Sequence, residues 1–127
     1  MPDGYPLASF AVFGNLGTTE TRFDGGMGNV ADFTGIATSV TARLVGSINN
    51  LSGTQTTFRL RADTNASAIG VTSPLVATFP VVHGNGQFSI AVTFTPSAGP
   101  HMYIVTQQTD AGTGTVDELV FILEAVP

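Results

Sequence analysis

The sequence predicts an all-β fold, either a β-sandwich or a barrel of short antiparallel strands. The clearest sign is the alternation of residues 87–95, where Phe88, Ile90, Val92 and Phe94 point one way and small or hydroxyl side chains point the other. Turn sequences rich in Gly, Asn, Ser and Pro interrupt such runs at short intervals. No stretch shows a sustained helical period, and a length of 127 residues predicts one domain.

The same alternation predicts three further strands. Residues 39–48, 55–62 and 101–108 each place apolar side chains on one face and mostly polar ones on the other. We expect Phe88, Ile90, Val92 and Phe94 to face the core, with three inward-pointing side chains of the earlier strands across it. These three side chains are Leu44, Phe58 and Leu60.

Two other segments are more continuously apolar. Residues 75–82 and 116–126 are therefore either central strands or strands that a neighbouring subunit covers on the second face. Pro80 lies inside the first of these segments. Because proline has no amide hydrogen for a strand ladder, this strand is expected at a sheet edge or at a bulge.

Residues 1–38 have a different composition, with seven glycines and regularly spaced aromatic residues. Two interpretations stay open. In one, the segment is an extended arm that inserts rings into pockets of a partner. In the other, it forms the first strands of the same sandwich, with a strand at Leu7–Phe13. The predicted organisation is therefore an arm or first strands at residues 1–38, and a β-sandwich domain at residues 39–127.

Charge and composition exclude several classes of function. The chain has four arginines, no lysine and nine acidic residues, for a net charge of -5, which argues against binding to nucleic acid or to an anionic membrane. It has no cysteine, which excludes a thiol nucleophile and fits synthesis in a reducing cytoplasm. The first residues lack a basic stretch followed by an apolar run, so we expect no signal peptide.

No pattern of residues predicts a catalytic, cofactor or metal site. His83 and His101 lie beside turns and outside any metal-binding spacing, and no Gly-x-Ser-x-Gly motif is present. Asp110, Asp117 and Glu118 lack the spacing of a calcium loop and are expected to be solvated. We therefore predict that the protein is not an enzyme and binds no cofactor.

The candidate functional residues are ones that would contact a partner protein. Three arginines are expected on the outward faces of two strands, which we expect to adjoin: Arg43, Arg59 and Arg61. They either form a plain polar surface or pair with carboxylates of another subunit. The aromatic residues of the first segment are the other candidates, if that segment is an arm. The full set is Tyr5, Phe10, Phe13, Phe23, Phe33, Arg43, Arg59 and Arg61.

Four stretches carry a resemblance to known proteins: Thr-Ala-Arg-Leu-Val-Gly-Ser-Ile at 41–48, Thr-Thr-Phe-Arg-Leu-Arg-Ala-Asp at 56–63, Phe-Ser-Ile-Ala-Val-Thr-Phe-Thr-Pro-Ser-Ala-Gly-Pro-His-Met-Tyr-Ile-Val at 88–105, and Val-Phe-Ile-Leu-Glu-Ala-Val at 120–126. The chain over residues 39–127 resembles the small jelly-roll or Ig-like β-sandwich proteins of tailed-phage virions, such as capsid decoration proteins and tail-fibre heads. The resemblance rests on style and composition, so it transfers no functional residues.

The resemblance implies an antiparallel sandwich of about seven to eight short strands. It implies a non-enzymatic virion protein, most of all a capsid decoration or stabilising protein, which assembles in the host cytoplasm. Its partners would be other copies of itself, as in a trimer, and a major capsid or other virion protein. The alternative is the receptor-binding or carbohydrate-binding head of a tail fibre or adhesin. Against this alternative, the chain has no Trp and only Tyr5 and Tyr103 as tyrosines.

Overall fold

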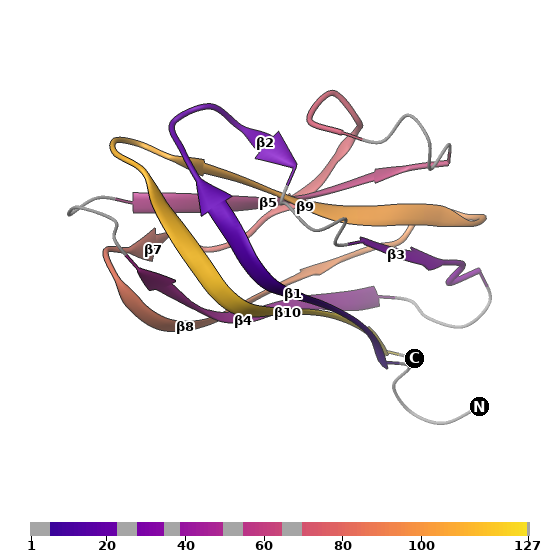
Figure 1. Cartoon of the computed structure of the whole chain (residues 1–127). Coiled ribbons are helices and arrows are strands. Elements are labelled where there is room, and N and C mark those ends of the chain that lie inside the picture. Colours follow the sequence, from indigo (N-terminus) through magenta and orange to yellow (C-terminus); the bar gives the residue numbers. More distant parts are fainter. Residues whose placement is uncertain (1–5, 23–27, 35–38, 50–54, 65–69, 127) are drawn as a thin grey trace.

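In the computed structural model, the protein is described over residues 6–22, 28–34, 39–49, 55–64 and 70–126. These residues form ten strands and no helix (Figure 1), which confirms the predicted all-β sandwich with more strands than the expected seven to eight. The strands are β1 (Pro6–Leu16), β2 (Thr21–Arg22), β3 (Gly28–Ala31), β4 (Ser39–Asn49), β5 (Gln55–Asp63), β6 (Leu75–Thr78), β7 (Val82–His83), β8 (Gly86–Phe94), β9 (His101–Thr109) and β10 (Gly114–Val126).

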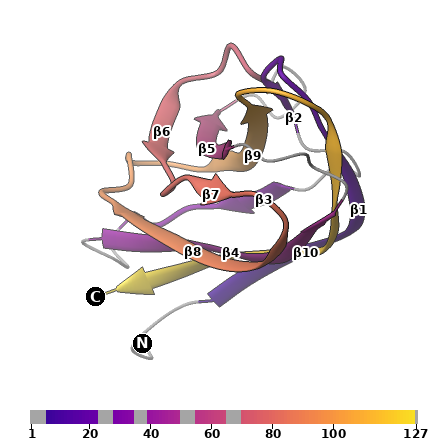
Figure 2. The ribbon, with the colours of Figure 1, turned by 90° about the vertical axis from the view of Figure 1, so that its left-hand side faces the viewer.

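The strands pair in the order of a jelly roll. The first sheet has the order β1-β10-β4-β8, and the second has the order β2-β9-β5-β6, with β3 also paired to β9 and β7 also paired to β5. All pairs are antiparallel. β2 and β3 can be counted as one interrupted strand, and so can β6 and β7. The chain is then a long hairpin whose two arms pair with each other, beginning at β5 and β6. Rolling this hairpin up produces the two stacked sheets (Figure 2).

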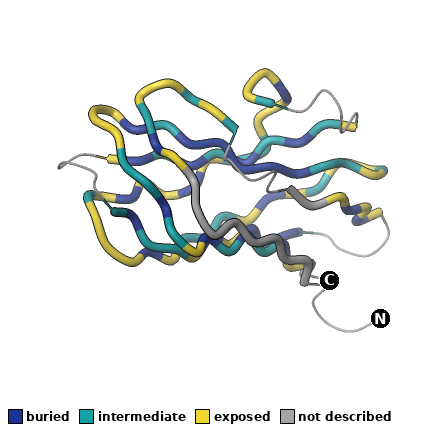
Figure 3. The backbone as a smooth tube through the Cα atoms, viewed as in Figure 1, coloured by how far each residue is buried: buried dark blue, intermediate teal, exposed yellow. Residues whose placement is uncertain are grey.

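The core lies between the sheets, as the alternation of the sequence predicts (Figure 3). Phe58 of β5 stacks on Phe88 of β8 with 5.4 Å between ring centroids, and Phe94 lies 5.7 Å from the ring of Tyr103. These contacts join the two sheets. One expectation about the core is wrong: Leu44 does not lie across the core from residues 88–94, because β4 and β8 are neighbours in one sheet, where Leu44 pairs with Ile90.

The two continuously apolar segments have different explanations. Residues 116–126 belong to β10, a central strand between β1 and β4, and its register with β4 shifts between Asp117 and Val120. Glu118 has a φ of 52° at this bulge, so that both Val116 and Leu119 face the core. Residues 75–82 form no central strand. They hold β6 and β7 at a sheet edge, on either side of Phe79–Val81, and thus confirm the edge position predicted from Pro80.

The described part of residues 1–38 forms strands of both sheets. β1 pairs with β10 from Pro6 to Leu16, whereas β2 and β3 pair with β9. Leu16, Ala31 and Phe33 are buried in the common core. These residues therefore match the second interpretation, in which the segment forms the first strands of the same sandwich.

Candidate functional site

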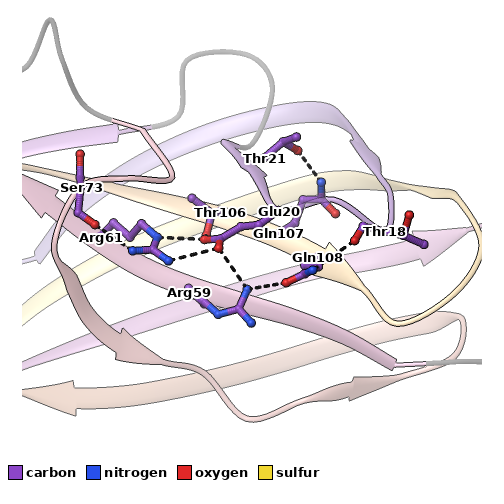
Figure 4. Close-up of polar contacts among 9 residues, drawn as sticks. All are labelled: Thr18, Glu20, Thr21, Arg59, Arg61, Ser73, Thr106, Gln107 and Gln108. Carbon is purple, nitrogen blue, oxygen red and sulfur yellow. Dashed lines mark hydrogen bonds and ion pairs between the residues drawn. The ribbon is translucent and has the colours of Figure 1, made fainter.

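The outer face of the second sheet carries a compact charged cluster (Figure 4). Glu20 precedes β2, and its carboxylate accepts hydrogen bonds from Nε and Nη2 of Arg61 at 2.9 and 3.1 Å. Nη1 of Arg59 lies 3.5 Å from the same carboxylate. A bidentate contact of this kind fixes both partners more strongly than a single ion pair does.

Neutral side chains complete the cluster. The Thr106 hydroxyl donates to Glu20 at 2.6 Å, and Nη1 of Arg61 donates to the carbonyl oxygen of Ser73 at 2.8 Å. Nη1 of Arg59 donates to the Gln108 side-chain oxygen at 3.0 Å, and the Gln108 amide donates to the carbonyl oxygen of Thr18 at 3.1 Å. The guanidinium groups are therefore used to hold the connection between β1 and β2 against β9 and β5.

Electrostatics in the cluster favour the ionised form of Glu20. Partial burial alone would raise its pKa. Hydrogen bonds from Arg61 and Thr106, together with the charges of Arg61 and Arg59, outweigh burial and hold the pKa of Glu20 below its ordinary value. At neutral pH, Glu20 is a carboxylate that pairs with both arginines.

The three arginines singled out by the sequence do not share a face. Arg59 and Arg61 lie on β5 in the second sheet, whereas Arg43 lies on β4 in the first. The expectation that the two strands adjoin is wrong, because the chain passes from one sheet to the other between β4 and β5. Arg22 pairs with Thr106 and takes the third position on the face of Arg59 and Arg61.

The outer face of the first sheet is mostly uncharged. Val45 is 39% exposed, and Val120 and Ile122, from the adjacent β10, are partly exposed. Val45 pairs with Val120 and with Ser89, and Arg43 pairs with Ile122 and with Ala91, so the register brings these residues together. The described residues include no ion pair of Arg43 or Glu124, which are exposed on β4 and β10 of this face. Glu118 of β10 is also exposed and lines a pocket with Val45 at one end of the face. We call the surface formed by Arg43, Val45, Ala91, Val120 and Ile122 the neutral face.

The aromatic candidates have mixed outcomes. Phe33 is only 2% exposed, and its ring packs at 6.0 Å from Tyr103, so it fills the core of its own chain instead of a partner's pocket. Phe10 and Phe13 belong to β1, where they pair with Val120 and Asp117. Tyr5 and Phe23 lie outside the described residues. Their part in partner binding stays a prediction.

A pocket of about 390 Å³ opens at one end of the sandwich. Its polar lining includes Asp63, Ser97, His101 and Tyr103, and Leu75 adds an apolar wall. Nδ1 of His101 lies 2.9 Å from the carbonyl oxygen of Gly99, and an Nδ1–H bond there would leave Nε2 as an acceptor. Burial, together with the charge of Asp32, raises the pKa of Tyr103, so its hydroxyl keeps its proton at neutral pH. The pocket thus places a phenol, a hydroxyl and an imidazole beside one carboxylate.

Sequence reasoning missed Glu20 and Arg22. Both lie in a stretch without alternation, and Glu20 is 41 positions from its partner Arg61, so no local pattern indicated the contact. Within the described residues, no three His, Asp or Glu side chains gather as a metal site would require, and no helix has the length and apolarity to cross a membrane. No known family model matches the chain, and no curated protein matches its sequence.

Proposed function

We propose that the protein is a non-enzymatic structural component of a virion, a capsid decoration or stabilising protein, that docks through its neutral face. The jelly-roll order supports this by analogy, because viral capsid proteins are one of the groups that use this architecture. The proposed partners are other copies of the chain and a major capsid protein. Assembly takes place in the host cytoplasm.

The observation that carries the proposal is the composition of the neutral face. Its side chains are aliphatic or small, apart from Arg43, and Thr41 and Thr93 extend it with a hydroxyl–hydroxyl contact of 3.1 Å. Covering such a surface buries few unpaired charges, so the free-energy cost of its desolvation is low compared with that of an ordinary charged surface.

The charged cluster on the opposite face supports the same assignment. Glu20 already occupies Arg59 and Arg61, which lowers their value as contacts for an acidic partner. Arg43 lies on the neutral face and makes no ion pair among the described residues, so it is available for an intermolecular ion pair there. A capsid contact would therefore be apolar at its centre, with Arg43 as a single charged element.

Particles purified from a culture of the encoding virus provide the test. We expect the protein in many copies per particle by quantitative mass spectrometry, and on the outer shell by electron microscopy. Recombinant protein should bind particles stripped of it, and Val45→Glu should abolish this binding. Val81→Glu is the matched control, because Val81 is also 39% exposed but lies next to β7, away from the neutral face. Absence from the particles, or equal binding by both variants, would refute the proposal.

The end pocket supports a second candidate, a carbohydrate-binding or receptor-binding head. Tyr103, His101 and Asp63 offer a ring, a hydroxyl, an imidazole and a carboxylate to a small polyol. Titration with a panel of free hexoses, followed by NMR, tests this function. If a hexose binds there, Tyr103→Phe should weaken binding about tenfold, which corresponds to roughly one lost hydrogen bond. No saturable shift with any hexose would remove this candidate.

A further inference from the structure

β8 is a long sheet edge without the usual protection. It lies at the end of the first sheet and pairs, among the described residues, with β4 alone. Its register with β4 runs without a bulge from Gly86 to Phe94, and the strand contains neither a proline nor a charged residue. Charges, prolines and bulges are the devices that keep sheet edges from pairing with other strands.

The other described edges are short or interrupted. β2, β3 and β7 have two to four residues, and β6 has four residues, a register shift opposite Leu60 and Arg61, and prolines at positions 74 and 80. β1, at the far edge of the first sheet, is the exception: it spans 11 residues without a charged side chain, and its proline, Pro6, stands only at its first position. Two further features separate β8 from β1: the partly exposed core residues beside it and its sequence symmetry.

The core is also incompletely closed along β8. Four hydrophobic residues pack against the core while remaining partly exposed, and all four lie on β6 and β8, the facing edge strands. They are Val76, Ala77, Ile90 and Val92. Figure 2 shows β8 in the lower layer with β6 and β7 above it. A strand added beside β8 would cover Ile90 and Val92.

The sequence of β8 is close to a palindrome about Ala91. Residues 88–94 are Phe-Ser-Ile-Ala-Val-Thr-Phe. When two copies pair antiparallel about a two-fold axis at Ala91, Phe88 lies opposite Phe94 of the second copy, Ser89 opposite Thr93, and Ile90 opposite Val92. Ala91 lies opposite its own copy. Each of the other pairs joins aromatic with aromatic, hydroxyl with hydroxyl, or β-branched with β-branched, which are pairs that stabilise antiparallel sheets.

We propose that a second copy of this chain pairs with β8 about a two-fold axis at Ala91. The two first sheets become one continuous eight-stranded sheet, and the strand ladder satisfies the backbone groups of both edges. In a pairing about a two-fold axis, a charged side chain of β8 would lie near the same charge on the second copy and be repelled by it. β8 has no charged residue, so this repulsion is absent. The nearest charged side chain across the ladder is Arg43, opposite Ala91 on β4, and the two Arg43 side chains are separated by both β8 strands. This inference shares Ala91 with the neutral face, but it does not rest on the virion proposal, because the backbone groups and the sequence of the β8 edge carry it.

The absence of cysteine from the chain allows a test of the register. Directly opposite residues have Cα atoms about 4.5–5.5 Å apart, within the range of roughly 4.4–6.8 Å that a disulfide spans. Under mild oxidation, Ala91→Cys should form a covalent dimer. Ser89→Cys alone and Thr93→Cys alone should not, because each residue is offset from its own copy by four positions, about 13 Å along the strand. An equal mixture of Ser89→Cys and Thr93→Cys should cross-link as a heterodimer.

Val81→Cys measures random collision, since Val81 is exposed but lies off β8. Sedimentation of the unmodified full chain should show a monomer–dimer equilibrium that moves toward dimer with concentration. Circular dichroism and thermal melting check that each variant folds, and the Ser89→Cys and Thr93→Cys mixture reports the same register should Ala91→Cys melt early. A chain that stays monomeric at its highest soluble concentration would overturn the proposal. So would cross-linking of every variant at the rate of Val81→Cys, or of Ser89→Cys as fast as Ala91→Cys. Neither result would affect the particle-binding test.

Discussion

The outer faces of the two sheets use charge in different ways. On the second sheet, Arg59 and Arg61 converge on Glu20 and hold the connection between β1 and β2 in place. On the first sheet, Arg43 and Glu124 make no ion pair among the described residues, and Val45 and Val120 lie between threonines and serines. In a chain with few charges, one face uses charge to hold its own fold together. The other face has few charges, so its burial against a partner costs little desolvation free energy. The predictions below test this contrast, beginning with the largest expected effect.

The largest change in the free energy of unfolding is expected from the core that the two sheets share. Phe94 is 8% exposed and contacts Tyr103 of the opposite sheet. We expect Phe94→Ala to lower the free energy of unfolding by about 3–5 kcal/mol, because it removes a large buried side chain and leaves a cavity. Urea denaturation followed by circular dichroism measures this change. A loss below about 1 kcal/mol would show that Phe94 contributes little to joining the sheets.

The contrast itself is tested by removing one glutamate from each face. Glu20→Ala leaves Arg59, Arg61 and Thr106 without their shared acceptor, and should lower the free energy of unfolding by roughly 1–3 kcal/mol. Glu124→Ala is the matched control on the first sheet, and its effect should stay within about 0.5 kcal/mol. The same denaturation experiment measures both. Equal effects would mean that the charged cluster is no more than an ordinary surface ion pair.

The sequence was sufficient for the strands but not for the neighbours of each strand. Alternation located β4, β5 and β8, because each has one face in the core, and it also located β9, whose central residues are buried on both faces. It wrongly suggested that β4 and β5 adjoin, since alternation reports which side chains are buried and not which sheet a strand joins. In a jelly roll, the chain changes sheet between these two strands.

The candidate site was predictable only in part. Arg59 and Arg61 were found because they alternate with Phe58 and Leu60. Glu20 was missed because its role depends on a contact between distant parts of the chain, which no local pattern of residues indicates. The bulge at Glu118 likewise moves the inward face of β10 by one residue, which no alternation pattern predicts.

The pH dependence of stability separates the two faces further. The pKa of Glu20 is lower in the folded chain than its ordinary value of 4.5, so the unfolded chain takes up a proton first as the pH falls. The stabilisation from Glu20 is therefore complete above about 4.5 and is lost as the pH falls through the lower folded value. The difference in unfolding free energy between the natural chain and Glu20→Ala should shrink across this window.

Other carboxylates contribute equally to the natural chain and to Glu20→Ala, so they do not affect the difference between the two. Hydrogen bonds from Thr34 also lower the pKa of Asp32, but this contribution is common to both chains and cancels in the difference. The same difference is measured for Glu124→Ala as a reference. A difference for Glu20→Ala that grows on acidification would contradict the lowered pKa.

The smallest effect is expected from salt acting on the neutral face. At about 1 M salt, the screening length falls to roughly 3 Å, which weakens exposed ion pairs that are worth about 1 kcal/mol or less to begin with. Apolar contacts are not screened, whereas guanidinium weakens them directly. Protein bound to viral particles should therefore stay bound in about 1 M sodium chloride and be released by guanidinium chloride, as measured by sedimentation of the particles. Release by sodium chloride alone would mean that Arg43, rather than the aliphatic side chains around it, holds the protein in place, and Arg43→Ala would then be expected to abolish binding at low salt.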